Sequence, residues 1–127
     1  MLFGYTILYV EDVPNSVAFY EKAFGFKRRF LHEGCDYGEL DTGGTVLAFA
    51  SRKLIAELGK NPSTPVENSP CFEIAFVTED VSAALAQAVT AGATQVQAPE
   101  EMPWGQTIAY VRDIDGFLVE LCTPVAA

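Results

Sequence analysis

Two glutamates lie in segments that are otherwise apolar, and their carboxylates could do chemistry there. Glu120 belongs to DIDGFLVEL (residues 113–121), a turn followed by a strand that is apolar on both faces. Glu73 begins EIAFVTEDV (residues 73–81), where its strand neighbours are again apolar. A carboxylate in such surroundings is costly unless its charge is compensated. The alternative is that each glutamate lies at a wetted sheet edge.

If both carboxylates face one cavity, three kinds of compensation are open. A shared proton would raise the pKa of one glutamate and suit it to acid–base catalysis, with Glu120 as the catalytic residue. A hard cation prefers about six oxygen ligands, and only Glu73, Glu120 and the phenol of Tyr5 can be named, so no metal and no other cofactor is expected. A divalent metal on Glu73 and Glu120 is the alternative. The third option is a cationic group on a ligand.

Aromatic side chains could bind the body of such a ligand. Trp104 lies in MPWGQ, a loop bounded by proline and glycine, where a large ring is not needed to fill a core. We therefore expect Trp104 and Tyr5 to line a ligand site with Glu73 and Glu120. Three further aromatic residues fit either a pocket or the core: Tyr9, Tyr37 and Phe49. His32, the one histidine, has no partner at a motif spacing and is expected at a surface or strand end.

The elements that position these residues follow one plan twice. The stretch YTILYVEDV (residues 5–13) predicts a strand, then a helix capped by Asp12 and ended by Gly25. The pattern returns from residue 73, with Asp80 as the cap and Gly92 after the last turn. The apolar stripes of the two predicted helices are Val13, Val17, Tyr20 and Phe24, and Val81, Ala84, Leu85, Ala88 and Val89.

Three strand-like runs follow each helix. In the first half they span residues 26–32, 36–42 and 45–51, and in the second half 94–100, 106–113 and 117–123. The chain is therefore α+β, with two βαβββ modules at about residues 3–52 and 71–124. A linker of about residues 53–70 joins them, with a short helix predicted at its start and three of the seven prolines within it.

Four stretches resemble the vicinal oxygen chelate superfamily, which includes glyoxalase I, bleomycin-resistance proteins and extradiol dioxygenases. They are LYVEDVPNSVAFYEKAFGF (8–26), ELDTGG (39–44), FVTEDVSAALAQAVTAGA (76–93) and PWGQTIAYVRDIDGFLVEL (103–121). The resemblance implies a single domain over residues 1–127, in which the paired modules form a cupped eight-stranded mixed sheet with helices on its outer face. It also implies a homodimer.

The resemblance further implies where metal ligands would lie, on the first and last strands of each module. These places carry Tyr5, Ala48, Glu73 and Glu120 in this sequence. Ala48 has no ligand atom and a phenol has a pKa near ~10. Histidine or glutamine is common where Glu73 stands, so only Glu120 fits the metal-binding pattern.

Composition bounds the remaining possibilities. The 127 residues suffice for one core, half of them are hydrophobic, and no apolar run is long enough to span a bilayer. Eight basic against seventeen acidic residues give a net charge of −9, which disfavours nucleic acid and anionic membranes. Without a secretory signal, a cytoplasmic location is expected. Cys35, Cys71 and Cys122 show no paired spacing and are expected as small buried residues.

The sequence therefore predicts a metal-free, cytoplasmic, dimeric protein of the glyoxalase and bleomycin-resistance type. It would sequester a small cationic or aromatic molecule. The alternative is an enzyme, a glyoxalase-like lyase or isomerase or a dioxygenase, which uses Glu120 and Glu73 in acid–base or metal roles. A pure interaction module would instead expose a large apolar patch.

Overall fold

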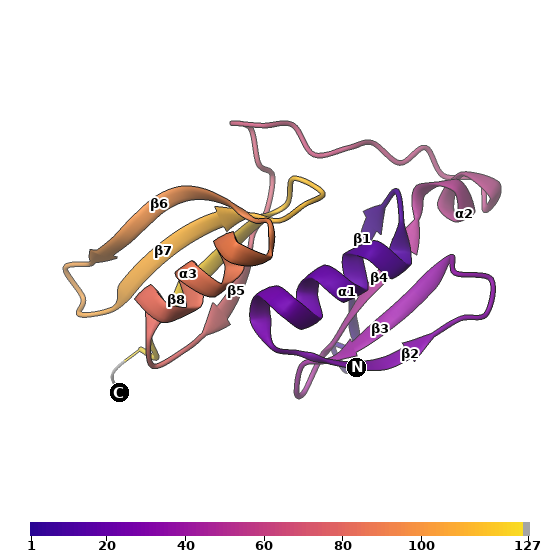
Figure 1. Cartoon of the computed structure of the whole chain (residues 1–127). Helices are drawn as coiled ribbons and strands as arrows, with labels where there is room; N and C mark the ends of the chain where they lie inside the picture. Colours follow the sequence, from indigo (N-terminus) through magenta and orange to yellow (C-terminus); the bar gives the residue numbers. More distant parts are fainter. Residues whose placement is uncertain (126–127) are drawn as a thin grey trace. The chain divides into compact units, whose positions relative to one another are not determined.

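The computed structural model describes residues 1–125 and divides between Thr64 and Pro65 into two compact units. Figure 1 shows the elements of both units. The first unit contains β1 (Tyr5–Val10), α1 (Val13–Phe24), β2 (Lys27–Leu31), β3 (Tyr37–Asp41), β4 (Val46–Ser51) and α2 (Arg52–Glu57). The second contains β5 (Ile74–Val77), α3 (Val81–Ala91), β6 (Thr94–Glu101), β7 (Thr107–Arg112) and β8 (Leu118–Cys122).

Helix α1 begins and ends at the predicted residues. The Asp12 carboxylate accepts a hydrogen bond of 3.1 Å from the backbone N–H of Asn15, and Pro14 occupies the first turn. Gly25 ends the helix with φ of 75°, a left-handed conformation that glycine adopts without steric cost. The short helix predicted after the first module is also present, as α2.

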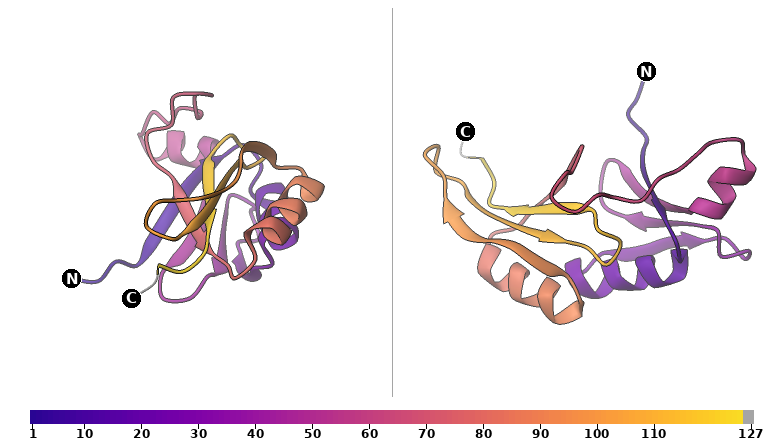
Figure 2. Two further views of the ribbon diagram at one scale, coloured as in Figure 1. Left: turned by 90° about the vertical axis from the view of Figure 1, so that its left-hand side faces the viewer. Right: turned by 90° about the horizontal axis from the view of Figure 1, so that it is seen from above.

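The first sheet has the strand order β1-β4-β3-β2, with β1 parallel to β4 and the other pairs antiparallel. One face of this sheet is covered by α1 (Figure 2), through Val13, Val17 and Tyr20. Helix and sheet approach closely at Gly38, where an added Cβ would lie 3.1 Å from a methyl carbon of Val17. Phe49, which the sequence left open between a pocket and the core, is fully buried in this core.

The second sheet repeats this topology in the order β5-β8-β7-β6. Helix α3 has its predicted cap, since the Asp80 carboxylate accepts from the Ala83 N–H at 3.0 Å. It covers one sheet face with Val81, Leu85 and Ala88. Val89, at the margin of the predicted stripe, is 42% exposed.

The α+β class and the two βαβββ modules are thus confirmed, and the eight strands are divided between two four-stranded mixed sheets. In each unit the helix covers one face only, so the opposite face, here called the open face, is available to other groups (Figure 2). No helix within residues 1–125 is long and apolar enough to cross a membrane.

The cysteines differ in part from the expectation. Cys122 is buried, as predicted, but Cys35 and Cys71 are exposed. Both exposed cysteines lie outside the strands, Cys35 in the turn after β2 and Cys71 ahead of β5, where no core exists to bury them.

Candidate functional site

The two glutamates singled out in the sequence belong to one cluster on the open face of the second sheet. The Tyr110 hydroxyl is 2.8 Å from Glu120 Oε1 and 3.4 Å from both carboxylate oxygens of Glu73. One phenol therefore bridges two carboxyl groups that lie far apart in the sequence.

Strand register brings these three side chains together. Glu120 of β8 pairs with Tyr110 of β7 on one side and with Ala75 of β5 on the other. Side chains of directly paired residues project from the same face of a sheet, so Tyr110 and Glu120 are neighbours. Glu73 lies two residues before Ala75, just ahead of β5, and therefore reaches the same face.

The helix side of β8 is fixed by Val119 and Leu121, which are buried against the core. Because successive side chains of a strand point to opposite faces, the Glu120 side chain points to the open face, where Glu120 is half-buried. This alternation answers why an apolar strand contains a carboxylate. Glu73 is exposed and Tyr110 half-buried, so the cluster has access to solvent.

Partial burial and the neighbouring Glu120 carboxyl raise the pKa of Glu73 above its ordinary value. Desolvation is the largest cause, followed by hydrogen bonding to Glu120 and repulsion from its charge. The hydrogen bond to Tyr110 acts in the opposite direction, because a phenol donor favours the ionised carboxylate. Two interacting carboxyl groups of this kind hold a proton more readily than either would alone.

The same charges affect the groups around them. The pKa of Tyr110 is raised by its own burial and then by the Glu120 and Glu73 carboxylates, so the phenol stays a donor at neutral pH. Burial, and then Glu120, raises the pKa of the Cys122 thiol to about 11. Cys122 is therefore a neutral, unreactive thiol rather than a nucleophile.

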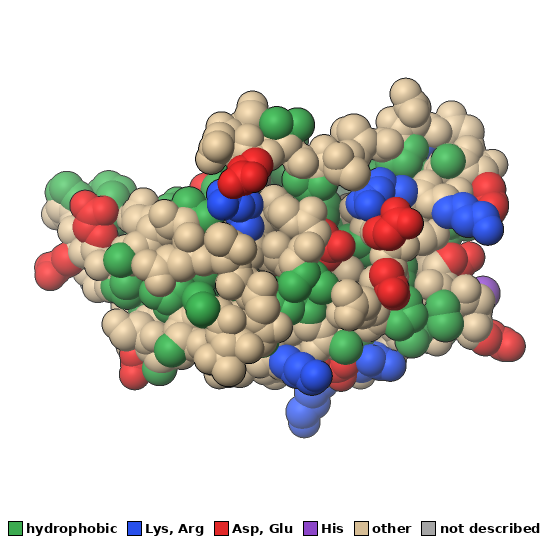
Figure 3. Space-filling model, turned by 45° about the horizontal axis from the view of Figure 1, so that its top comes forward, with side chains coloured by type: hydrophobic (Ala, Val, Ile, Leu, Met, Phe, Trp, Pro, Cys, Tyr) green, Lys and Arg blue, Asp and Glu red, His purple; other side chains and the backbone are tan. Residues whose placement is uncertain are grey.

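Neither Glu73 nor Glu120 takes part in an ion pair that the structure shows within residues 1–125. Elsewhere acidic side chains do have basic neighbours, and Figure 3 shows several acidic and basic groups side by side. Examples are Glu21 with Arg28 at 2.9 Å and Glu11 with Arg52 at 3.1 Å. At the Glu73–Glu120 pair the partner that the structure shows is the Tyr110 phenol instead of a cation.

The first unit has a related but different arrangement. Ala48 of β4 pairs with Ile7 of β1 and with Glu39 of β3, so it takes the position that Glu120 has in the second sheet. Here the acid is Glu39, which accepts a 2.6 Å hydrogen bond from the Tyr37 hydroxyl. Arg29 lies 3.4 Å from Glu39, so this carboxylate, unlike Glu120, has a cationic partner.

The other predicted site residues are placed as follows. Tyr5 lies on β1 in the first unit, is 56% exposed, and contributes electrostatically to a raised pKa of Tyr37. Trp104 is 58% exposed in the β6–β7 turn, and its indole N–H donates to Gln106 Oε1 at 2.7 Å. The structure thus joins Glu73 with Glu120 in the second unit, whereas Tyr5 belongs to the first unit and Trp104 bonds to Gln106.

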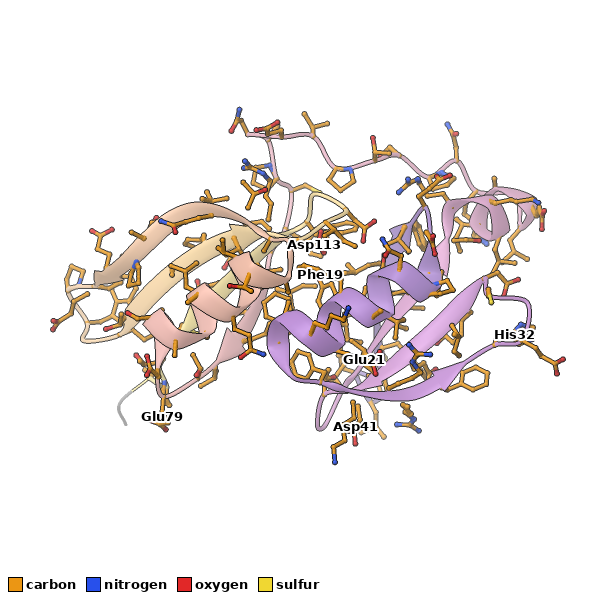
Figure 4. All side chains as sticks on the ribbon, in the orientation of Figure 1. Phe19, Glu21, His32, Asp41, Glu79 and Asp113 are labelled. Carbon is orange, nitrogen blue, oxygen red and sulfur yellow. The ribbon has the colours of Figure 1, made fainter. Side chains whose placement is uncertain are left out.

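Two turn residues have structural roles. His32 is exposed near the β2–β3 turn, as expected (Figure 4), and its Nδ1 accepts from the Gly34 N–H at 3.2 Å. Asp113, labelled in the same figure, is buried in the β7–β8 turn. Its carboxylate accepts from the backbone N–H groups of Asp115 and Phe117 and so fixes the turn that leads into β8.

Tyr110 was missed by the sequence reasoning. The available signal was its place in QTIAYVRD, a strand in which Ile108, Tyr110 and Arg112 alternate with residues of the opposite face. Once β7 is aligned with β8, Tyr110 is the residue across from Glu120. That alignment could not be derived from the alternation alone.

The donor set does not fit a resident metal. Of the four ligand positions implied by the resemblance, Ala48 is fully buried and offers no donor atom, and Tyr5 offers a phenol. Within the described residues, no group of three or more histidine, cysteine, aspartate or glutamate side chains could hold a metal ion.

Comparison with known proteins gives the family. The sequence profile of the Glyoxalase/Bleomycin resistance protein/Dioxygenase superfamily matches residues 2–121. The chain belongs to this superfamily. It is 28% identical to the uncharacterized protein YraH of Bacillus subtilis (strain 168) over 117 residues, covering 90% of this chain and 91% of that relative.

Solved structures show the same fold. A glyoxalase-related enzyme from Fulvimarina pelagi has a TM-score of 0.83 and 22% identity, with 98% of this chain and 88% of that chain covered. TioX from Micromonospora sp. ML1 has a TM-score of 0.74 and 23% identity, with 97% and 98% covered. At these identities the likeness concerns the fold.

Proposed function

We propose that this protein binds and sequesters a small molecule that carries a protonated amine on an aromatic or apolar body, without using a metal. The observation that supports this proposal is the Glu73–Tyr110–Glu120 cluster, in which two carboxyl groups lie together without an ion-pair partner within residues 1–125. A ligand cation would supply the charge that the protein itself does not.

The energetics favour a cation at this place. Two close carboxylates repel each other, and either a proton or a positive group relieves that repulsion. An ammonium ion offers three donors and can contact both carboxylates at once. The net charge of −9 also raises the local concentration of cations near the protein.

Aromatic surface is available within the second unit. Phe72, next to Glu73, is 46% exposed and packs edge-to-face on Phe117 with ring centroids 6.0 Å apart. Trp104 exposes an indole in the β6–β7 turn. Such rings attract organic cations through the ring quadrupole, in addition to burying apolar area.

Isothermal titration with benzylamine tests the proposal. We expect Glu120→Gln to weaken benzylamine binding about tenfold, corresponding to ~1.4 kcal/mol, because it removes a charge from the pair. Binding should also weaken as the pH falls through the raised pKa of Glu73, since a protonated Glu73 no longer attracts the ammonium group.

Glu39→Gln is the matched control. Glu39 also accepts a tyrosine hydrogen bond, but Arg29 already compensates its charge. Benzylamine affinity should therefore stay unchanged in this variant. Equal losses in Glu39→Gln and Glu120→Gln, or no benzylamine binding by the wild-type protein, would contradict the proposal.

The raised pKa of Glu73 favours a second candidate function, an acid–base lyase or isomerase in which Glu73 or Glu120 transfers a proton. A metal-dependent glyoxalase-like or dioxygenase activity is the related alternative. Elemental analysis of the purified protein separates these cases. Stoichiometric metal that disappears in Glu120→Gln would overturn the metal-free proposal.

A further inference from the structure

A cavity of about 120 Å³ lies in the second unit, and two of its wall residues, Arg112 and Leu118, form the cross-strand pair next to Tyr110 and Glu120. Part of its wall comes from residues 65–70, here called the strap, which contributes Val66 and Pro70. The sheet contributes Val96, Arg112 and Leu118. A cavity of roughly 150 Å³ holds benzene, so this smaller space suits a branched aliphatic group or one end of a substituted ring.

Two contacts hold the strap against the sheet. Pro65 lies over Gly116, where an added Cβ would be 3.4 Å from the proline Cβ. Glu67 forms a 3.2 Å ion pair with Arg112 of β7. Glu67 is presented by a turn closed by the Ser69 N–H to Val66 carbonyl hydrogen bond, with Asn68 in a left-handed conformation that asparagine tolerates.

The two side chains of this ion pair differ in their exposure to solvent. The Arg112 side chain is 22% exposed and contributes to the cavity wall, whereas the Glu67 side chain is 70% exposed. An ion pair with so exposed a partner contributes little to stability, and its loss costs the strap little. A ligand carboxylate entering the cavity could therefore replace Glu67 on Arg112, in the two-point geometry that a guanidinium offers.

The cavity and the carboxyl pair share one sheet face. Arg112 pairs across the strands with Leu118, and the next pair on that face is Tyr110 with Glu120. Two residues along a strand span roughly 7 Å. The backbone positions of Arg112 and of the Tyr110–Glu120 pair thus lie about one substituted ring apart along the strands.

We propose that the strap cavity binds the carboxylate end of an amino-carboxylate ligand, with Arg112 replacing its bond to Glu67 by a bond to the ligand. The amine end of the ligand rests on the function proposed above, since it uses Glu73 and Glu120. Glu67 acts as a built-in substitute for the ligand carboxylate while the site is empty.

Three related probes test this inference on the whole protein by isothermal titration at low salt: benzylamine, benzoate and 4-(aminomethyl)benzoate. The last carries both charged groups on opposite ends of one ring. We expect 4-(aminomethyl)benzoate to bind about tenfold more tightly than benzylamine, because only it engages Arg112.

Two variants should change this affinity in opposite directions. Arg112→Gln should reduce the affinity for 4-(aminomethyl)benzoate to that for benzylamine, whereas Glu67→Gln should increase it a few-fold by removing the competing carboxylate. Arg28→Gln and Glu21→Gln, which break a comparable exposed ion pair in the first unit, are matched controls and should change nothing. General loss of structure cannot produce opposite signs, and circular dichroism checks that each variant is folded.

The outcomes separate the two proposals. If 4-(aminomethyl)benzoate binds no more tightly than benzylamine, or if Arg112→Gln leaves its affinity unchanged, only the present inference is overturned. Arg112-dependent binding of benzoate without any binding of benzylamine overturns the amine site, and with it the amino-carboxylate class.

Discussion

Tyr110 determines how two carboxyl groups can share one small region. Its hydroxyl donates to Glu120 at 2.8 Å and contacts Glu73, so one phenol offsets part of the repulsion between the acids. The pKa of Tyr110 is raised first by its burial and then by the Glu120 and Glu73 carboxylates, so the phenol remains a hydrogen-bond donor. Desolvation, followed by the hydrogen bond to Glu120 and repulsion from its charge, raises the pKa of Glu73.

The raised pKa of Glu73 predicts a pH-dependent contribution to stability. Because the pKa of Glu73 is higher in the folded protein than in the unfolded chain, the folded state binds the proton more tightly. The resulting stabilisation is complete below the unfolded value of about 4.3 and is lost as the pH rises through the raised folded value. The free energy of unfolding of the wild-type protein should therefore fall, relative to that of Glu73→Gln, as the pH rises through this range. We expect less than about 1 kcal/mol, because the exposed site is screened by solvent.

Urea unfolding of both proteins between pH 4 and pH 8 measures the difference. Glu79→Gln is the control, since Glu79 is an exposed glutamate in the loop before α3 (Figure 4). This variant is the reference for removing one negative charge away from the Glu73–Tyr110–Glu120 cluster. A Glu73→Gln curve that runs parallel to wild type throughout would contradict the raised pKa.

At the scale of elements, one glycine decides how closely α1 packs on its sheet. A Cβ at Gly38 would lie between 3.1 and 3.3 Å from carbon atoms of Val17, Leu31 and Val13, all of them core or strand side chains. These neighbours belong to two elements, α1 and β2, and none can move without disturbing its own packing.

Gly38→Ala should therefore destabilise the protein by about 1–3 kcal/mol, the usual cost of overpacking a core. Gly44→Ala is the matched control, because nothing lies within 4 Å of a Cβ at that position. Thermal unfolding of both variants gives the comparison. Equal melting temperatures for the two variants would show that α1 can shift away from β3 at little cost.

At the scale of the whole molecule, the chain repeats one βαβββ topology, and the two units differ in the residues on their open faces. Both sheets have the same strand order, but the glutamate that accepts the tyrosine hydrogen bond pairs with Arg29 in the first unit, whereas Glu120 in the second has no ion pair among the described residues. We propose that the molecule functions as a homodimer, as the resemblance to its family implies.

The net charge gives this dimer proposal a measurable consequence. Two copies that each carry −9 repel each other, and salt screens that repulsion over a distance of about 10 Å at 0.1 M. The dimer fraction seen by light scattering after gel filtration should therefore rise from 0.01 M to 0.3 M NaCl, at roughly constant pH. A monomer at every salt and protein concentration would reject the proposal.

The sequence by itself determined the elements and the family. Caps at Asp12 and Asp80, the glycine at position 25 and the alternation of β8 act over a few residues, so their signals are local and can be recognised without a structure. The same alternation identified Glu120 as unusual, and the repeat of the βαβββ pattern gave the α+β class.

Only the tertiary structure decided what surrounds Glu120. Its contact with Tyr110 depends on the register of β7 against β8, and the approach of Glu73 depends on β5 pairing with β8 across more than forty residues of sequence. The Arg112–Glu67 ion pair likewise depends on where the strap crosses the sheet. Register and loop path result from the packing of the whole unit, because the free energy that selects them is spread over many contacts and is not encoded by any single segment.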